Sequence, residues 1–349
     1  MSHMLNVKKL TRRQALATGV AALAMPFIAR TAFAARELRI FTWEGYGEPQ
    51  WVKPFEEKTG ARAKVAYTLS VDEMFAKMQA SKGSDYDVIA FDTSMFGRYI
   101  DDSLVQPIDV GKIPNAANLV PAFRQVAPIR RGDKQYGMPF AWGSIPLIYD
   151  KGAFPSAPES WEVMWDPQYA QQMIALDDTN NYLVTVAIAL GIKDPFNWTD
   201  SDFDKVKQKA IEQKGLLLTY YNGNDGGVDI FASSGIKLML SAGEPQLPAL
   251  IKRGVNAGLT IPREGAIGWL DNWTISAGAT DVDLAHAWID VCLEKSVGAA
   301  LSDHAHYGNV TDRAANERNG YTYGDRLVWL QSPEDWNRRV KLWNEVKAS

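Results

Sequence analysis

Tryptophan and tyrosine rings recur beside carboxylates in several short segments of this chain. Trp43 and Tyr46 flank Glu44, and Trp269 precedes Asp271 by two residues. A carboxylate neutralises an ammonium group and accepts its hydrogen bonds. The face of an aromatic ring attracts a cation by about 0.5–2 kcal/mol and covers its methylene groups. Rings and acids that meet in one cleft would therefore suit a protonated amine.

Two further segments carry polar residues directly after apolar runs. Residues 92–94 follow the run 87–91, and residues 177–181 follow the run 173–176; both runs predict buried strands. Open α/β sheets bind their ligands outside the carboxyl ends of the strands. The candidate ligand-binding residues in these two segments are Asp92, Ser94, Asp178 and Asn181.

The elements that position these residues alternate between strand and helix. Residues 38–41 alternate like a strand, residues 49–59 have helical spacing, and Val65 and Tyr67 mark a second strand. Ser70 and Glu73 have the spacing of a capping box, which predicts that the next helix starts here. This β-α-β-α-β order predicts a doubly wound α/β lobe.

The remainder of the chain repeats this alternation. Helices are expected at 182–190, 201–213 and 280–301, and strands at 173–176, 235–240 and 258–261. Residues 332–335, Ser-Pro-Glu-Asp, are typical of a helix start. Residues 137–139 and 261–263 each carry a proline and predict the points at which the chain crosses between lobes.

The N-terminal 34 residues are typical of an export leader. Basic residues, including Arg12 and Arg13, precede an apolar run at 15–28, and Ala32-Phe33-Ala34 supplies a cleavage site. Residues 11–16 look like a twin-arginine motif. The apolar run is shorter than the roughly 20 residues that span a bilayer. We therefore expect a protein that works in the periplasm and does not insert into the membrane once the leader is removed.

The composition of the chain restricts the class of protein further. Removing a leader that holds five basic and no acidic residues changes the formal net charge from −4 to −9. No segment is basic enough to predict nucleic-acid binding. About 315 residues favour two lobes over a single core. Cys292 is the only cysteine, so no disulfide can form within one chain.

The sequence gives little support to an enzyme. It contains no Gly-x-Ser-x-Gly elbow, phosphate loop or dinucleotide fingerprint. His304 and His306 have no evident third partner for a metal ion. We therefore expect no catalysis, no cofactor and no metal.

Together these segments resemble the periplasmic spermidine/putrescine-binding proteins of ATP-binding-cassette (ABC) importers. Residues 40–46, Ile-Phe-Thr-Trp-Glu-Gly-Tyr, resemble the family's first strand and its Trp-x-x-Tyr loop. Residues 160–169, Ser-Trp-Glu-Val-Met-Trp-Asp-Pro-Gln-Tyr, match its Ser-Trp-x-x-Leu-Trp-x-Pro-x-Tyr signature. Residues 262–271 match its Pro-Lys-Glu-Gly and Trp-x-Asp segment.

This resemblance implies a type II periplasmic-binding-protein fold. That fold is α/β and two-lobed, each lobe is a doubly wound sheet with flanking helices, and the lobes close over the ligand. The expected division is a twin-arginine-type signal at 1–34, lobe 1 at 35–140 plus 262–306, and lobe 2 at 141–261 plus 307–349.

The resemblance also implies roles for single residues. Trp43, Tyr46 and Trp269 match ligand-contacting aromatics, and Asp271 matches the amine-binding carboxylate. The remaining matches are Asp178 and Glu244 to acids, Tyr307 to a tyrosine near a crossover, and Gln331 to a glutamine contact. The complete set of predicted ligand-binding residues is Trp43, Glu44, Tyr46, Asp92, Ser94, Asp178, Asn181, Glu244, Trp269, Asp271, Tyr307 and Gln331.

The chain departs from the family pattern at three places. Asn181 stands where many members have Glu, Asp92 stands in place of a Pro-Ser loop, and the segment that begins at Ser241 lacks a tryptophan of the second lobe. One acid is therefore lost and others are gained, and the exact ligand stays open.

The resulting expectation is a monomeric, extracytoplasmic solute-binding protein that captures a small cationic amine by lobe closure and serves an ABC permease. One alternative is a protein of the same fold for another small ligand, such as an amino-acid derivative or an organic anion. Four arginines could favour an anion if several faced the cleft: Arg98, Arg124, Arg130 and Arg131. An exported enzyme is the alternative of another class.

Overall fold

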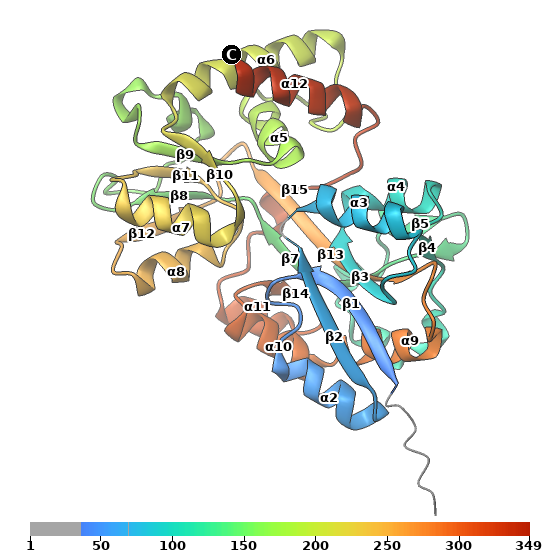
Figure 1. Ribbon diagram of the computed structural model, residues 1–349. Helices are drawn as coiled ribbons and strands as arrows, with labels where there is room; N and C mark the ends of the chain where they lie inside the picture. Colours follow the sequence, from blue (N-terminus) through green and yellow to red (C-terminus); the bar gives the residue numbers. More distant parts are fainter. Residues whose placement is uncertain (1–35, 69) are drawn as a thin grey trace, which may run out of the picture. The chain divides into compact units, whose positions relative to one another are not determined.

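The computed structural model describes residues 36–68 and 70–349, and the predicted leader at 1–34 lies outside them. The described chain forms two main sheets, each with helices on both faces (Figure 1). The chain passes from the larger to the smaller sheet between Ser144 and Leu147 and returns between Thr260 and Ala266. The predicted α/β fold with two sheet-and-helix lobes is confirmed.

The larger sheet has the strand order β14-β7-β13-β3-β1-β2, and β4 and β15 pair with opposite ends of β13. Strand β1 is parallel to β2 and β3, whereas β13 is antiparallel to β3 and β7. The strands are β1 (Glu37–Trp43), β2 (Arg62–Thr68), β3 (Val88–Asp92), β4 (Val105–Gln106), β7 (Met138–Ser144), β13 (Ala266–Ser276), β14 (Gly308–Asn309) and β15 (Leu327–Trp329).

Alternation along β1 explains why this sheet is covered on both faces. Leu38 and Ile40 pack into the buried cluster that contains Trp51 of the first described helix. Phe41, which points the other way, packs into a separate cluster with Met74. Successive side chains of a strand face opposite sides, so apolar residues at both parities require helices on both faces.

The smaller sheet has the strand order β10-β9-β11-β8-β12. In Figure 1, helices α5, α6 and α12 lie over one face of it, and α7 and α8 lie over the other. Its strands are β8 (Leu147–Asp150), β9 (Met173–Leu176), β10 (Thr219–Tyr221), β11 (Leu238–Leu240) and β12 (Ala257–Thr260). A separate hairpin pairs β5 (Arg130–Arg131) with β6 (Lys134–Gln135).

Local sequence signals set many of the helix ends. The Ser70 side chain accepts a hydrogen bond from the Glu73 backbone N–H at 3.1 Å and so begins α3. Thr199 and Asp202 form a reciprocal capping box at the start of α6. The helices are α2 (Pro49–Thr59), α3 (Val71–Ser81), α4 (Phe96–Asp101), α5 (Thr179–Ala189), α6 (Asp200–Leu216), α7 (Gly223–Ser233), α8 (Gln246–Lys252), α9 (Val282–Cys292), α10 (Lys295–His304), α11 (Arg313–Arg318) and α12 (Trp336–Ala348).

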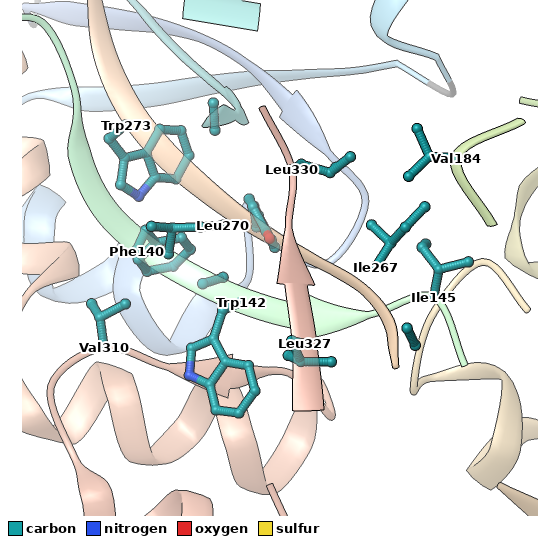
Figure 2. Close-up of a cluster of buried hydrophobic side chains, with 14 of the residues drawn as sticks. Phe140, Trp142, Ile145, Val184, Ile267, Leu270, Trp273, Val310, Leu327 and Leu330 are labelled. Atoms are coloured by element: carbon teal, nitrogen blue, oxygen red, sulfur yellow. The ribbon is translucent and has the colours of Figure 1, made fainter. Parts of the chain in front are cut away.

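One buried cluster continues from the larger sheet to the smaller one. Figure 2 shows Ile145, Val184 and Ile267 close together at the start of β13, where α5 approaches this strand. Phe140 and Trp273 extend the same cluster along β7 and β13 (Figure 2). The strands that lead between the sheets are therefore anchored in packed apolar side chains.

Three local predictions were wrong. The single helix expected at 280–301 is two helices, α9 and α10, because Glu294 has an extended backbone (ψ 140°) between them. The crossing expected at 137–139 comes after Ser144, since β7 continues in the larger sheet. The helix expected to start at Ser332 starts at Trp336, because the Ser332 hydroxyl instead bonds the backbone oxygen of Ser94.

The division into lobes at residues 140 and 307 stays a prediction. Strands β14 and β15 were expected in lobe 2. Both pair with strands of the larger sheet, which belongs to lobe 1 in that division. Helix α12, by contrast, packs on α5 and α6 beside the smaller sheet, as that division expects.

Candidate functional site

A cavity of about 240 Å³ lies where loops from both sheets meet. Strands β1, β3 and β9 direct their carboxyl ends to it, which brings Trp43, Asp92 and Asp178 together. The lining residues are Trp43, Glu44, Tyr46, Thr68, Ser70, Val71, Asp92, Leu176, Asp177, Asp178, Asn181, Asn222, Gly223, Asn224, Ala242, Pro245, Trp269, Asp271, Tyr307 and Leu330.

Asp271 and Asp92 form the acidic floor of this cavity. They are directly opposite each other in the antiparallel pair of β13 and β3. Their exposed fractions are only 6% and 9%. The Tyr46 hydroxyl donates a hydrogen bond of 2.7 Å to Asp271 Oδ2, and the Ser94 backbone N–H donates one of 2.8 Å to Asp92 Oδ1.

A register irregularity in the sheet accompanies Asp271. The pairing of β13 with β7 shifts between Asp271 and Asn272. Bulges of this kind redirect side chains and are frequent beside functional sites. The shift falls at the residue that accepts the Tyr46 hydrogen bond.

Burial dominates the ionisation of both floor carboxyls. Burial raises the pKa of Asp271 to about 8; the Asp92 charge adds to the rise, and the Tyr46 hydrogen bond opposes it. Burial likewise raises the pKa of Asp92, against the hydrogen bonding at Ser94. A carboxylate is costly to desolvate, so a cation placed here would be strongly stabilising.

Asp178 and Asn181 supply acceptors from the side of the smaller sheet. Asp178 is the N-cap of α5, where its Oδ1 accepts a hydrogen bond of 2.8 Å from the Asn181 backbone N–H. Burial raises the pKa of Asp178 to about 6 against that hydrogen bond, and the Asp92 charge adds to the rise. Within the described chain, the buried Asn181 Oδ1 has no hydrogen-bond partner. Both groups accept hydrogen bonds, so this side suits a ligand that donates them.

Aromatic rings form the wall between these acids. Trp43, Trp269 and Tyr307 are all half-buried and line the cavity. Trp269 meets Tyr307 edge to face at a centroid distance of 5.4 Å, and Tyr46 meets Tyr307 in the same way at 5.7 Å. The Trp269 indole N–H donates to the Ser144 backbone oxygen at 3.2 Å, which fixes the ring plane.

Gly143 makes room for this wall. A Cβ at position 143 would overlap both the Trp269 ring and the Glu244 carboxylate. The close approach of β7 to the indole therefore requires glycine at this position.

The structure brings nine of the predicted residues to the cavity and places three outside its lining. Ser94 is buried in the turn after β3, with its backbone held by Asp92 and Ser332. Gln331 is exposed, and its neighbour Leu330 lines the cavity instead.

Glu244, the third residue outside the lining, is buried behind Trp269. Its Oε1 accepts hydrogen bonds from the Ser144 backbone N–H at 2.8 Å, from the Ser144 hydroxyl at 2.6 Å and from the Tyr323 hydroxyl. Burial raises the pKa of Glu244, and these hydrogen bonds oppose the rise. One oxygen of the Glu244 carboxylate, Oε1, is therefore already occupied by hydrogen bonds from the protein.

Some lining residues escaped the prediction from sequence. Thr68 ends β2, and Ser70 and Val71 follow it. Asn222, Gly223 and Asn224 follow β10. The rule that ligands lie at carboxyl ends of strands would have found the first group, because a strand was expected there. The second group follows a three-residue strand that the pattern did not predict.

The four arginines that could have favoured an anion lie elsewhere. Arg98 stacks over Phe75, Arg124 bonds the Leu119 backbone oxygen, Arg130 bonds Gln135, and Arg131 pairs with Asp101. None of the described residues that line the cavity is Lys or Arg. The alternative of an organic anion therefore gains no support from the cavity.

We also searched the described residues for a metal site, a reactive thiol and a membrane-spanning helix. Residues 36–68 and 70–349 contain no group of three or more His, Cys, Asp or Glu side chains placed to hold a metal ion. Cys292 is buried, and burial raises the pKa of its thiol. Of the helices that the structure describes, none combines the length and apolar character needed to cross a bilayer.

Two covered sheets that contribute to one acidic, ring-walled cavity define a binding protein for small solutes. A sequence profile described as "Bacterial extracellular solute-binding protein" matches residues 50–323. The chain therefore belongs to the family of bacterial extracellular solute-binding proteins.

Individual relatives agree with this assignment. The putrescine-binding periplasmic protein PotF of Escherichia coli is 26% identical, in an alignment covering 90% of this chain and 92% of PotF. The spermidine/putrescine-binding periplasmic protein of Salmonella typhimurium is 25% identical, covering 84% and 83%. The crystal structure of the TpPotD lipoprotein of Treponema pallidum has a TM-score of 0.77 at 22% identity, covering 89% and 99%.

These relatives confirm the resemblance to periplasmic polyamine-binding proteins. The family confirms the predicted function as a solute-binding protein that works outside the cytoplasm. The export leader at 1–34 and its twin-arginine character both stay predictions.

Proposed function

We propose that this solute-binding protein captures a small di- or polyamine of the putrescine or spermidine class. The observation that carries the proposal is the charge of the cavity, which presents buried carboxyls from the larger sheet, half-buried carboxyls from the smaller sheet, and no Lys or Arg among its described lining residues. The names of the relatives support the same class of ligand. An ammonium at each end of a short methylene chain matches acids that are separated by rings.

In this proposal Asp271 and Asp92 receive one ammonium, and Asp178 with the Asn181 amide oxygen receives the other. Trp43 and Trp269 cover the methylene groups between them. Charge-assisted hydrogen bonds and ring contacts together support micromolar affinity, or about −8 kcal/mol, after the ordering costs of binding. Covalent chemistry has no part in this function, and the protein acts as a carrier and not as an enzyme.

Closure of the two lobes is the proposed capture step. The acids come from both sheets, so a ligand contacts all of them only when the sheets approach each other. A ligand that binds the closed form better shifts the population toward it. The closed, monomeric protein then delivers the amine to the permease of an ABC importer.

A thermal-shift panel tests the ligand class. Bound ligand raises the melting temperature by mass action. Putrescine, spermidine and cadaverine should each raise it, whereas succinate, glutamate and citrate should leave it unchanged. A shift with an organic acid and none with any amine would overturn the proposal. A shift with a guanidino compound alone would keep the proposal that the acidic cavity binds a cation and would change the class of ligand from amine to guanidine.

A further inference from the structure

The two floor carboxyls of the cavity lie close to each other on neighbouring strands. Asp92 and Asp271 are cross-strand partners, and such partners on adjacent antiparallel strands have Cβ atoms about 4.5–5.5 Å apart. Both line the cavity and both are more than nine-tenths buried. A single ligand nitrogen can therefore reach both of them.

The groups around this pair do not neutralise it. The loop after β1 contributes the Tyr46 hydroxyl and the exposed carboxylate of Glu44. Helix α5 contributes Asp178, whose pKa the Asp92 charge helps to raise. Tyr307, which precedes β14, contributes a phenol whose pKa is raised by burial and then by the Asp271 charge.

The remaining neighbours are also neutral or acidic. Thr68 and Ser70 contribute neutral hydroxyls from the end of β2 and the start of α3. On the side of the smaller sheet, the Asp177 carboxylate is already held by Trp343 and Lys347 at 3.0 Å each. The described residues place no cation beside these two buried carboxyls. Two such carboxyls cannot both ionise cheaply, and the pair titrates as a unit.

On the basis of the proposed amine ligand, we infer that Asp92 and Asp271 act as one receptor for a single cationic end of that ligand. In the empty cavity this receptor holds a proton, which leaves when the cationic end binds. The carboxyl O–H bond breaks, its proton goes to water or buffer, and the two carboxylates accept hydrogen bonds from the ligand ammonium. Asp92 is thereby a specificity-determining residue that makes capture depend on pH.

The raised pKa values of both acids fit this exchange. Below pH 8 the ligand must displace the proton, so its affinity falls as the pH falls. When binding displaces one proton, the Kd for the ligand rises by at most tenfold for each pH unit that the pH falls. The protein would therefore release its cargo more readily in an acidic compartment.

Calorimetry with putrescine measures the proton directly. Titrations at pH 7.0 in phosphate and in MOPS, two buffers with different ionisation enthalpies, differ in heat by that enthalpy difference multiplied by the number of protons released. The wild type should release close to one proton, and its Kd should weaken severalfold from pH 7.5 to pH 6.5. Asp92→Asn should release fewer protons than the wild type and show a weaker pH dependence, because the Asp92 charge no longer adds to the burial that raises the pKa of Asp271. Asp133→Asn, which removes an exposed acid in the turn between β5 and β6 and away from the cavity, should retain the release.

A wild type that binds putrescine without releasing a proton would overturn the inference and leave the proposed function intact. Equal release from Asp92→Asn would overturn it as well. If no amine binds, the unliganded protein still tests whether the two carboxyls share a proton. The melting temperature of the wild type should fall from pH 6.5 to pH 8. This fall should be smaller in Asp92→Asn. Identical pH profiles for the two proteins would contradict a shared proton.

Discussion

The Tyr46 hydroxyl donates a hydrogen bond of 2.7 Å to Asp271 Oδ2, across 225 residues of sequence. Tyr46 follows the first strand of the larger sheet, and Asp271 lies in the middle of β13, two strands away. This bond orients the carboxyl toward the cavity and is the one side-chain donor that the described chain provides to it. It also lowers the pKa of Asp271 against the larger effect of burial.

Tyr46→Phe should weaken amine binding while the fold persists. The change keeps the ring that packs on Phe140 and Tyr307 and removes only the donor. Hydrogen bonds to charged groups contribute about 1.5–3 kcal/mol, so the Kd for putrescine should rise about tenfold or more. Tyr149→Phe, in a strand of the smaller sheet away from the cavity, is the matched control and should bind as the wild type does. Equal affinities for the two variants would remove Tyr46 from the site.

Gly143→Ala should disturb the aromatic wall. The added methyl group would overlap the Trp269 ring and the Glu244 carboxylate, so the indole must shift from its position in the cavity wall. We expect at least a fivefold loss of putrescine affinity and a loss of about 1–3 kcal/mol in stability from overpacking. The loss of affinity is read by calorimetry and the loss of stability by urea unfolding.

Gly215→Ala provides the comparison for this variant. Gly215 lies near the end of α6, and a Cβ there meets no atom within 4 Å. This substitution should leave affinity unchanged and keep or raise stability, because alanine favours helix over glycine. Similar losses of affinity and stability in both alanine variants would contradict the claim that overlap with the Trp269 ring causes the effect of Gly143→Ala.

Asp178→Asn should stabilise the empty protein at neutral pH. Asparagine keeps an N-cap acceptor for α5 and removes the buried charge. The pKa of Asp178 is about 6 in the folded protein and about 3.9 when unfolded. Between these values the folded state binds more protons, so the stability of the wild type falls as the pH rises from about 4 to 6.

Urea unfolding at several pH values checks this sign. At pH 7.5 the unliganded Asp178→Asn variant should exceed the wild type by about 1–3 kcal/mol relative to their difference at pH 4. The same variant should bind putrescine more weakly. A wild type that gains stability relative to the variant as the pH rises would contradict the burial of an unpaired carboxyl here.

The export prediction concerns residues outside the described chain. Replacing both Arg12 and Arg13 by Lys should block a twin-arginine route, because that route recognises the arginine pair. Immunoblots of periplasmic and cytoplasmic fractions measure the result, and a Lys8→Arg variant serves as the control. Undiminished periplasmic protein after the double change would indicate another export route.

Local signals in the sequence predicted elements well where neighbours in the chain decide them. The helix expected at 49–59 is α2 with the same bounds, and the strand expected at 173–176 is β9. Ser70 caps α3 as its spacing indicated. In each case, residues a few positions apart supply the apolar face or the cap.

Long-range contacts decided what the sequence could not predict. Ser332 was expected to cap a helix, but it bonds Ser94 and the helix begins at Trp336. The pairing of Asp92 with Asp271 depends on the register of β13 against β3, which no local pattern reveals. For Glu244, sequence placed an acid near the right loop, but only packing shows that it lies behind Trp269.

The most direct test of the account is a calorimetric titration of putrescine into the wild type and into Asp271→Asn at pH 7.5. Asp133→Asn, an exposed acid in the turn between β5 and β6, serves as the control. We expect micromolar binding by the wild type and the control, and a loss of about 2–5 kcal/mol in binding free energy in Asp271→Asn, because an ammonium would stay buried without its partner. Unchanged affinity in Asp271→Asn would contradict the claim that this buried carboxylate holds the ligand.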